Sequence, residues 1–167
     1  MTETVPFAIR AATEADVPVL LRMIRGLADY EKLTHEVVAT EAALRASMFG
    51  PRPAAEAMLG WVEGEPVAFA VFYPAFSTFL GSPTLYLEDL FVQPRWRGRG
   101  FGKRLLAAVA GVAVKRGLTR LEWAVLDWNE PAIRFYRSIG AEPREEWTVY
   151  RIANAELRRL ADLTADR

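Results

Sequence analysis

The sequence contains no cysteine and only one histidine, His35, among its 167 residues. The lack of cysteine excludes disulfide bonds, cysteine metal ligands and a covalent thiol intermediate, and it fits a reducing compartment. A single histidine cannot form a histidine metal cluster, and a Ser-His-Asp triad would have to use His35, which no nucleophile motif accompanies. We therefore expect His35 to be an exposed loop residue and the protein to hold no metal.

The sequence also lacks long apolar runs and an excess of either charge. No uninterrupted apolar run reaches the roughly 18 residues that span a bilayer, and 21 Lys and Arg residues balance 21 Asp and Glu residues. Residues 1–10 carry Glu3 and no basic start followed by an apolar run, so no secretory signal is expected. We expect a cytoplasmic protein without nucleic-acid or membrane partners, in which any charged ligand is recognised locally.

What the sequence does contain is the composition of an ordinary globular domain. Hydrophobic residues make up 51% of the chain and charged residues 25%, values typical of a protein that folds around one core. No repeat, low-complexity tract or linker divides the chain. We expect a single domain over residues 1–167.

Hydrophobic spacing predicts an α+β fold, with a mixed, mostly antiparallel central sheet flanked by helices. The strands are expected at residues 7–11, 57–63, 67–76, 84–92, 120–125 and 147–152. The helices are expected at residues 17–28, 40–49, 100–115 and 129–140, with a short terminal helix capped by Asn154. The order strand, helix, strand across residues 84–125 predicts one parallel crossover in the sheet.

The segment that joins residues 84–92 to residues 100–115 is rich in glycine and arginine. Gly98, Gly100 and Gly102 alternate there, and such a turn lets backbone amides approach an anion at the positive end of the helix dipole. Five cationic side chains surround the turn in a chain of zero net charge: Arg95, Arg97, Arg99, Lys103 and Arg104. The pattern favours a polyanion such as a pyrophosphate as the ligand.

Two common phosphate motifs do not fit this turn. A dinucleotide-binding fingerprint needs a third glycine five positions after the first, where this chain has Lys103. A P-loop needs glycine and Ser or Thr at the positions that Arg97 and Arg104 occupy. On the glycines alone, the alternative is that they only shape a tight turn and that the arginines form a solvated surface.

A more specific match comes from two motifs in register. Arg97, Gly100 and Gly102 resemble the phosphate loop of the GNAT superfamily of acyl-coenzyme A dependent N-acetyltransferases, and residues 129–136 followed by Gly140 and Ala141 resemble its second signature. Residues 27–33, 86–89 and 124–129 are similar to segments of the diamine and thialysine N-acetyltransferases. The resemblance runs from about Phe7 to Ala161 and implies the GNAT fold, acetyl-CoA as co-substrate and a homodimer.

The resemblance also implies which residues contact the coenzyme. The acetyl-pantetheine arm is expected to pair with the strand at Leu90, Phe91 and Val92, which is physically reasonable because unpaired strand amides and carbonyls need partners. The other expected coenzyme contacts are Arg97, Gly98, Arg99, Gly100, Phe101, Gly102, Lys103, Asn129 and Ala132. By its chemistry Asn129 is also a helix cap, and the two roles are compatible.

Glu88 and Tyr136 are the candidate catalytic residues. An amine whose pKa is near 10.4 is about 99.9% protonated at neutral pH, so a base must assist its attack on a thioester. In the resembling family the glutamate that matches Glu88 acts through a bound water. A phenol with a pKa near 10 can donate a proton to the leaving thiolate, which gives Tyr136 the role of general acid. Without the family resemblance, the alternative interpretation is that Glu88 is an exposed carboxylate on a strand and that Tyr136 is an aromatic residue of the core.

The acceptor is expected to be a small primary amine. Glu31, Asp89 and Glu146 match positions where the diamine enzymes carry substrate-facing acids, and Tyr30 lies beside the first of them. On an ideal strand Asp89 points away from Glu88, unless a bulge intervenes. Residues 76–79 contain no acid where the polyamine enzymes have one, which favours thialysine or another lysine analogue over a long polycation. The alternative function is a non-catalytic acyl-CoA sensor or interaction module.

Overall fold

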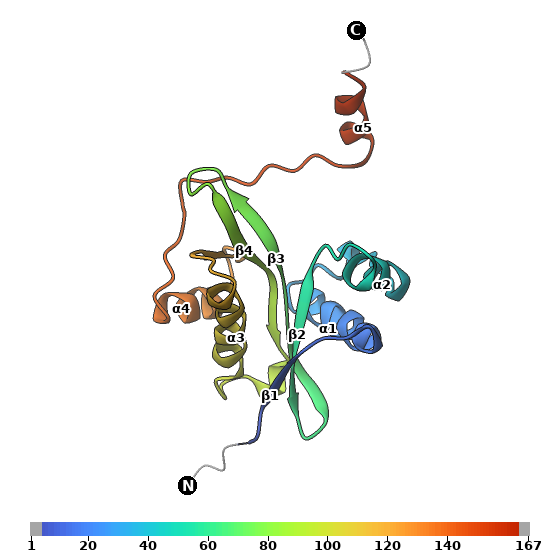
Figure 1. Cartoon of the computed structure of the whole chain (residues 1–167). Helices are drawn as coiled ribbons and strands as arrows, with labels where there is room; N and C mark the ends of the chain where they lie inside the picture. Colours follow the sequence, from blue (N-terminus) through green and yellow to red (C-terminus); the bar gives the residue numbers. More distant parts are fainter. Residues whose placement is uncertain (1–4, 164–167) are drawn as a thin grey trace. The chain divides into compact units, whose positions relative to one another are not determined.

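The computed structural model describes residues 5–163. The described chain forms two compact units, one up to Ala124 and one from Val125 onward. The first unit is a five-stranded mixed sheet with helices on both faces, which confirms the predicted α+β class (Figure 1). None of the helices in residues 5–163 combines the length and the apolar character needed to cross a bilayer.

The sheet of the first unit has the strand order β1-β2-β3-β4-β5. Neighbouring strands are antiparallel except β4 and β5, which are parallel and confirm the predicted crossover. The strands are β1 (Ala8–Ala11), β2 (Glu56–Val62), β3 (Glu65–Ser77), β4 (Ser82–Val92) and β5 (Leu121–Glu122). The last of these is much shorter than the predicted 120–125, because β5 pairs with β4 at two positions only.

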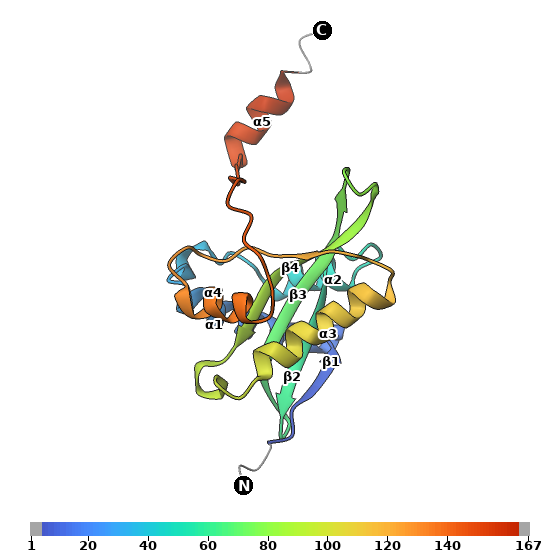
Figure 2. The same cartoon turned by 90° about the vertical axis from the view of Figure 1, so that its left-hand side faces the viewer.

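Helices cover both faces of this sheet. Figure 1 shows α1 (Val17–Tyr30) and α2 (Glu41–Phe49) on one face and α3 (Phe101–Lys115) on the other. Leu20 and Met23 of α1 belong to the same buried cluster as Leu59 and Phe69 of the sheet. Figure 2 shows α3 lying along the other face of the sheet, and its inward residues Leu105 and Val109 are fully buried. The apolar spacing of each helix therefore determines which side meets the sheet.

Short 3-10 turns connect these elements: Glu14–Asp16, Thr34–Glu36 and Pro94–Trp96. The first one forms a capping box, in which the Thr13 amide donates to Asp16 Oδ2 at 2.8 Å. The same carboxylate accepts two hydrogen bonds from Arg10, which hold the pKa of Asp16 well below its usual range. His35 lies in the second turn and is exposed, as predicted.

The second unit contains α4 (Glu130–Ser138) and α5 (Asn154–Asp162). The predicted strand at residues 147–152 was wrong, since this segment forms neither strand nor helix. A strand needs a neighbour to pair its backbone groups, and no strand within residues 5–163 pairs with this segment. The predicted cap of the last helix was also wrong: Ala153 is the N-cap, and Asn154 is the first helical residue.

Candidate active site

The glycine-rich turn, residues 98–102, leads directly into α3. Gly98 and Gly100 have φ angles of 75° and 77°, a left-handed conformation that glycine adopts without strain. Gly100 is the N-cap of α3, where no side chain caps the helix and no acidic residue occupies the first turn. A Cβ added at either glycine would meet no atom within 4 Å. The turn thus offers helix-terminal amides next to open space, an arrangement that suits an anion.

Three of the five cationic side chains near this turn, Arg95, Arg97 and Arg104, are held by hydrogen bonds or an ion pair. Arg95 forms an ion pair with Glu65, and Arg104 Nη2 donates to the carbonyl oxygen of Phe7 at 2.7 Å. Lys103 is exposed and, within residues 5–163, forms no ion pair. Arg95 and Arg104 therefore anchor the turn, whereas Lys103 has its charge available to a ligand.

Arg97 connects the turn to two other parts of the first unit. Its Nε donates to the carbonyl oxygen of Val92 at 2.9 Å. Its guanidinium carbon lies 4.1 Å from the ring centroid of Tyr30, at the C-terminal end of α1. Arg99 lies 4.9 Å over the ring of Trp96 in the preceding 3-10 turn. The structure thus brings the predicted coenzyme residue Arg97 next to the predicted substrate residue Tyr30.

Beyond Tyr86, the edge of β4 that faces β5 is not paired with another strand within residues 5–163. β4 pairs with β3 over its whole length, but it pairs with β5 only at Leu85 and Tyr86. On that side, residues 87–92 have no strand partner within the described chain. The predicted pantetheine-binding residues Leu90, Phe91 and Val92 all belong to this stretch.

A β-bulge in β4 places Glu88 and Asp89 together. Val71 of β3 is opposite Asp89 and Phe72 is opposite Leu87, so Glu88 is the extra residue of the bulge. Two successive residues in a bulge no longer alternate strictly between the faces of the sheet. Because of this bulge, the carboxylates of Glu88 and Asp89 are able to face the same site.

Asp89 is the carboxylate whose pKa is most affected by its neighbours in this region. Burial raises the pKa of Asp89 to about 7, and the negative charges of Glu88 and Glu31 add to the effect. Burial also raises the pKa of Glu31. The predicted base Glu88 and the predicted substrate residue Glu31 are thus each near enough to Asp89 to affect its pKa, and we refer to these three residues as the acidic cluster.

Tyr73 is a neighbour of Glu88 that the sequence analysis missed. Burial raises the pKa of Tyr73, and the negative charge of Glu88 adds to the effect. Tyr73 lies directly opposite Tyr86 across β3 and β4, with the ring centroids 5.3 Å apart. The sequence shows that Tyr86 lies two residues before Glu88. The contact between the rings of Tyr73 and Tyr86, however, depends on the register of β3 and β4.

The remaining predicted site residues belong to the second unit. The Asn129 side chain accepts a hydrogen bond from the Ala132 amide at 3.4 Å, which confirms its role as the cap of α4. Tyr136 lies about two turns further along α4, and its ring centroid is 5.2 Å from that of Phe135. Glu146 is exposed and forms an ion pair with Arg144, which lowers the pKa of Glu146 together with a backbone hydrogen bond.

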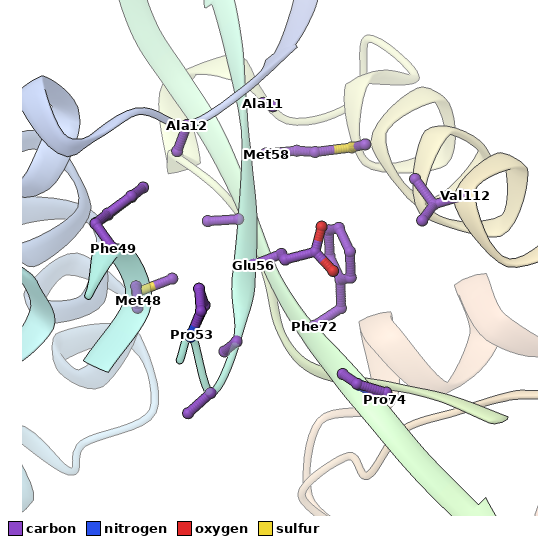
Figure 3. Close-up of a pocket in the computed structure, with 13 residues that line it drawn as sticks. Ala11, Ala12, Met48, Phe49, Pro53, Glu56, Met58, Phe72, Pro74 and Val112 are labelled. Atoms are coloured by element: carbon purple, nitrogen blue, oxygen red, sulfur yellow. The ribbon is translucent and has the colours of Figure 1, made fainter. Parts of the chain in front are cut away.

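A separate cavity of about 560 Å³ lies around the beginning of β2 (Figure 3). Its 13 lining residues include none of the predicted site residues and only one charged side chain, Glu56. Arg116 holds that carboxylate in two hydrogen bonds of 2.7 Å. The cavity therefore has no unpaired charge for a ligand, and the acidic cluster and the glycine-rich turn are the better candidate site. No group of three His, Cys, Asp or Glu side chains in residues 5–163 is arranged to hold a metal ion.

The protonation of Asp89 leads to a prediction about stability. Because its pKa is raised to about 7 in the folded protein, Asp89 retains a proton between about pH 4 and 7 that the unfolded chain releases. The free energy of unfolding should therefore fall by up to about 4 kcal/mol as the pH rises through this window. The variant Asp89→Asn should lack this fall, as measured by urea unfolding at pH 5 and pH 8. Equal pH dependence in both proteins would contradict the assignment.

Comparison with known proteins identifies similar chains over nearly the whole sequence. The family model described as the acetyltransferase (GNAT) family matches residues 24–141. The thialysine N-epsilon-acetyltransferase of Bos taurus is 39% identical over 92% of this chain and 96% of its own. The L-ornithine N5-acetyltransferase of Arabidopsis thaliana is 32% identical over 93% and 88%.

Solved structures show the same fold. An integron cassette protein from the mobile metagenome of V. cholerae superposes with a TM-score of 0.78 at 26% identity, covering 93% of this chain and 97% of its own. An aminoglycoside N-acetyltransferase in complex with CoA gives a TM-score of 0.73 at 18% identity, over 92% and 99%. These similarities confirm the family resemblance and the fold predicted from the two sequence motifs.

Proposed function

This chain belongs to the acetyltransferase (GNAT) family and is an N-acetyltransferase, and from this premise we propose that it transfers an acetyl group from acetyl-CoA to the primary amine of a small molecule. The observation that carries the proposal is the glycine-rich turn, with its helix-terminal amides, exposed Lys103 and the adjacent stretch of β4 that lacks a strand partner on one side in the described chain. This set of groups fits a diphosphate joined to an amide-bearing arm.

The coenzyme would be held by the turn and by the strand edge of the first unit. Amides near Gly98 and Gly100 would bind the diphosphate, and backbone groups of residues 90–92 would pair with the pantetheine arm. Arg97 donates a hydrogen bond to the carbonyl oxygen of Val92. It would give up this bond in order to bind a phosphate. When bound, acetyl-CoA supplies the activated acetyl group. The other proposed contacts are Arg99, Phe101, Gly102, Lys103, Asn129 and Ala132.

Glu88 and Tyr136 would supply the proton transfers. Deprotonation of an amine with a pKa near 10.4 costs about 4 to 5 kcal/mol at pH 7, and Glu88 would offset this by accepting the proton, directly or through a water. Tyr136 would donate its phenolic proton to the departing sulfur. Because the chain has no cysteine, the amine would attack the thioester directly while both substrates are bound.

The acidic cluster supports a small cationic acceptor. The charges of Glu88 and Glu31 both raise the pKa of Asp89, and a group of neighbouring carboxylates favours an ammonium group over a neutral ligand. Thialysine, lysine and ornithine each carry a second amino group that the cluster would hold while the first one reacts. Tyr30 and Glu146 are the further proposed contacts to the acceptor. The single-domain organisation, the homodimer and the cytoplasmic location remain predictions.

The glycine-rich turn gives a prediction about coenzyme binding. Gly100→Ala should raise the Kd for CoA about tenfold, because a side chain at a φ of 77° costs about 1 to 2 kcal/mol and shifts the amides from their positions. The matched control is Gly111→Ala in the interior of α3, where an added Cβ meets no atom within 4 Å. The control should keep the Kd of the wild type and gain up to about 1 kcal/mol of stability. Equal Kd values for Gly100→Ala and the wild type would contradict a role of the turn.

The proposed activity is tested by thiol release from acetyl-CoA with a panel of amines. The panel contains thialysine, lysine, ornithine, spermidine and a peptide with a free amino terminus. We expect release with the small diamino acids and much less with spermidine or the peptide. Binding of acetyl-CoA without release for any amine would instead support the second candidate, an acyl-CoA sensor that uses the same turn.

A further inference from the structure

Arg97 is a long, exposed side chain at the start of the segment that leads to the glycine-rich turn. It is the C-cap of the 3-10 turn Pro94–Trp96, and core packing does not fix its guanidinium. An exposed arginine has many rotamers of similar energy, and the entropy lost when one of them is fixed weakens binding. A side chain that the fold already holds near its ligand avoids most of this loss.

Two contacts within the first unit hold Arg97. Its Nε donates to the carbonyl oxygen of Val92 at 2.9 Å, and its guanidinium carbon lies 4.1 Å from the centroid of the Tyr30 ring. The Phe91 ring is further from the same carbon, at 5.6 Å. A guanidinium within about 6 Å of a ring centroid is attracted by the negative face of the ring. Tyr30 therefore makes the closer of the two aromatic contacts with the Arg97 charge.

The Tyr30 ring is itself held by helix α1 and by the core. Tyr30 is the last residue of α1, and the amide of the following residue, Glu31, donates to the carbonyl oxygen of Leu27 at 2.9 Å. The Tyr30 side chain is half-buried and packs against the buried cluster that includes Phe91. An aromatic side chain also has few torsions to fix. The ring thus provides a fixed surface for the long Arg97 side chain.

We propose that Tyr30 is a positioning residue for the coenzyme, whose ring holds the Arg97 guanidinium beside the glycine-rich turn for contact with the diphosphate. This inference rests on the proposed function, in which Arg97 binds a phosphate. Stacking uses the face of the guanidinium, whereas its N–H donors lie in its plane. The contact with Tyr30 therefore persists when Arg97 exchanges the Val92 carbonyl for a phosphate. This role uses the face of the ring, and the acceptor contact proposed above would use the hydroxyl.

Substitutions at Tyr30 separate the ring from the hydroxyl. Tyr30→Leu removes the ring and keeps an apolar side chain against the buried cluster, whereas Tyr30→Phe keeps the ring and loses only the hydroxyl. The matched control is Trp61→Leu in β2. Trp61 packs against the same cluster, and the guanidinium carbon of Arg10 lies 4.6 Å over its ring. The control thus removes a similar aromatic contact from a residue with no proposed role in binding.

The measurement is the Kd for CoA by isothermal titration calorimetry without an amine, so that the acceptor contact does not enter. We expect Tyr30→Leu to raise this Kd about 3- to 10-fold, as the loss of a cation–π contact implies. Tyr30→Phe and Trp61→Leu should stay within about twofold of the wild type. A wild-type Kd in Tyr30→Leu, or an equal rise in either of the other two variants, would overturn the proposal.

A double-mutant cycle then tests whether Tyr30 acts through Arg97. Arg97→Met keeps the length of the side chain and removes its charge and planar group, and it should raise the Kd about tenfold. In that background Tyr30→Leu should add no more than about twofold, because the group that the ring holds is already gone. If Tyr30→Leu raises the Kd by the same factor with and without the guanidinium, the ring acts on another group and the proposal falls.

The same titrations separate this inference from the proposed function. If the wild type and Tyr30→Leu bind CoA equally well, the inference fails and the proposed coenzyme stands. If the wild type does not bind CoA, both fall. A wild type that binds CoA but acetylates no amine of the panel would contradict the proposed transfer, and the ratio of the Kd values would still decide the role of Tyr30.

Discussion

Replacing Tyr136 by phenylalanine is expected to lower kcat by about 10²- to 10⁴-fold, the range typical of a lost general acid. The variant keeps the ring that packs 5.2 Å from Phe135 on α4 and loses only the hydroxyl. Without that proton, the coenzyme must depart as a thiolate, a poorer leaving group than the neutral thiol. Acetyl-CoA binding should change little, because the proposed coenzyme contacts do not involve this hydroxyl.

The measurement is the steady-state rate of thiol release, together with the Kd for acetyl-CoA. Tyr150→Phe is the matched control in the same unit, since Tyr150 is 92% exposed and has no proposed role. Its kcat should equal that of the wild type. If Tyr136→Phe turns over at the wild-type rate, Tyr136 is not the general acid. Water would then protonate the departing thiolate.

Glu88→Gln should have a comparable effect at neutral pH, with a distinct dependence on pH. Glutamine preserves the size of the side chain and cannot accept the proton, so the rate should fall by about 10²- to 10⁴-fold at pH 7. The remaining rate should follow the fraction of neutral amine, and rise about tenfold for each pH unit until it approaches the amine pKa near 10.4. The optimum of the variant therefore lies at higher pH than that of the wild type.

The control for this variant is Glu122→Gln, which removes an exposed carboxylate from the neighbouring strand β5. Its pH profile should superimpose on that of the wild type. A Glu88→Gln profile that also superimposes on the wild type would show that the amine loses its proton before it binds, with no base on β4 required.

The elements that the sequence predicts well are those with local causes. The apolar spacing of residues 17–28 and 101–115 depends on neighbours three and four positions apart, so both helices were predicted nearly to their ends. The cap at Asn129 depends on one side chain and one nearby amide, and it was confirmed. The glycine-rich turn was recognised because a left-handed backbone requires glycine at Gly98 and Gly100.

Features that depend on pairing between distant segments were not predicted. The bulge at Glu88 arises from the register between β3 and β4, and no residue type in the strand predicts it. The contact between the rings of Tyr73 and Tyr86 follows from the same register. The strand predicted at residues 147–152 failed for a related reason: alternation of apolar side chains favours a strand, but a strand forms only where a partner is present.

The structure shows two contacts of one predicted site residue that the sequence did not indicate. Arg97 was predicted as a phosphate contact, and in the structure it bonds to the Val92 carbonyl and lies over Tyr30. Both partners belong to the proposed site, one on the coenzyme side and one on the acceptor side. This double contact was invisible in the sequence because Tyr30, Val92 and Arg97 come from three different elements.

The central claim is that the turn at Gly98–Gly100 binds the diphosphate of a coenzyme. Isothermal titration calorimetry of the wild-type protein with CoA and with pantetheine, which lacks the diphosphate, tests it most directly. We predict saturable binding of CoA and at least a hundredfold weaker binding of pantetheine, because a single charged contact contributes about tenfold and several amides and cations share the diphosphate. Equal affinity for the two compounds, or no heat with CoA, would contradict the claim.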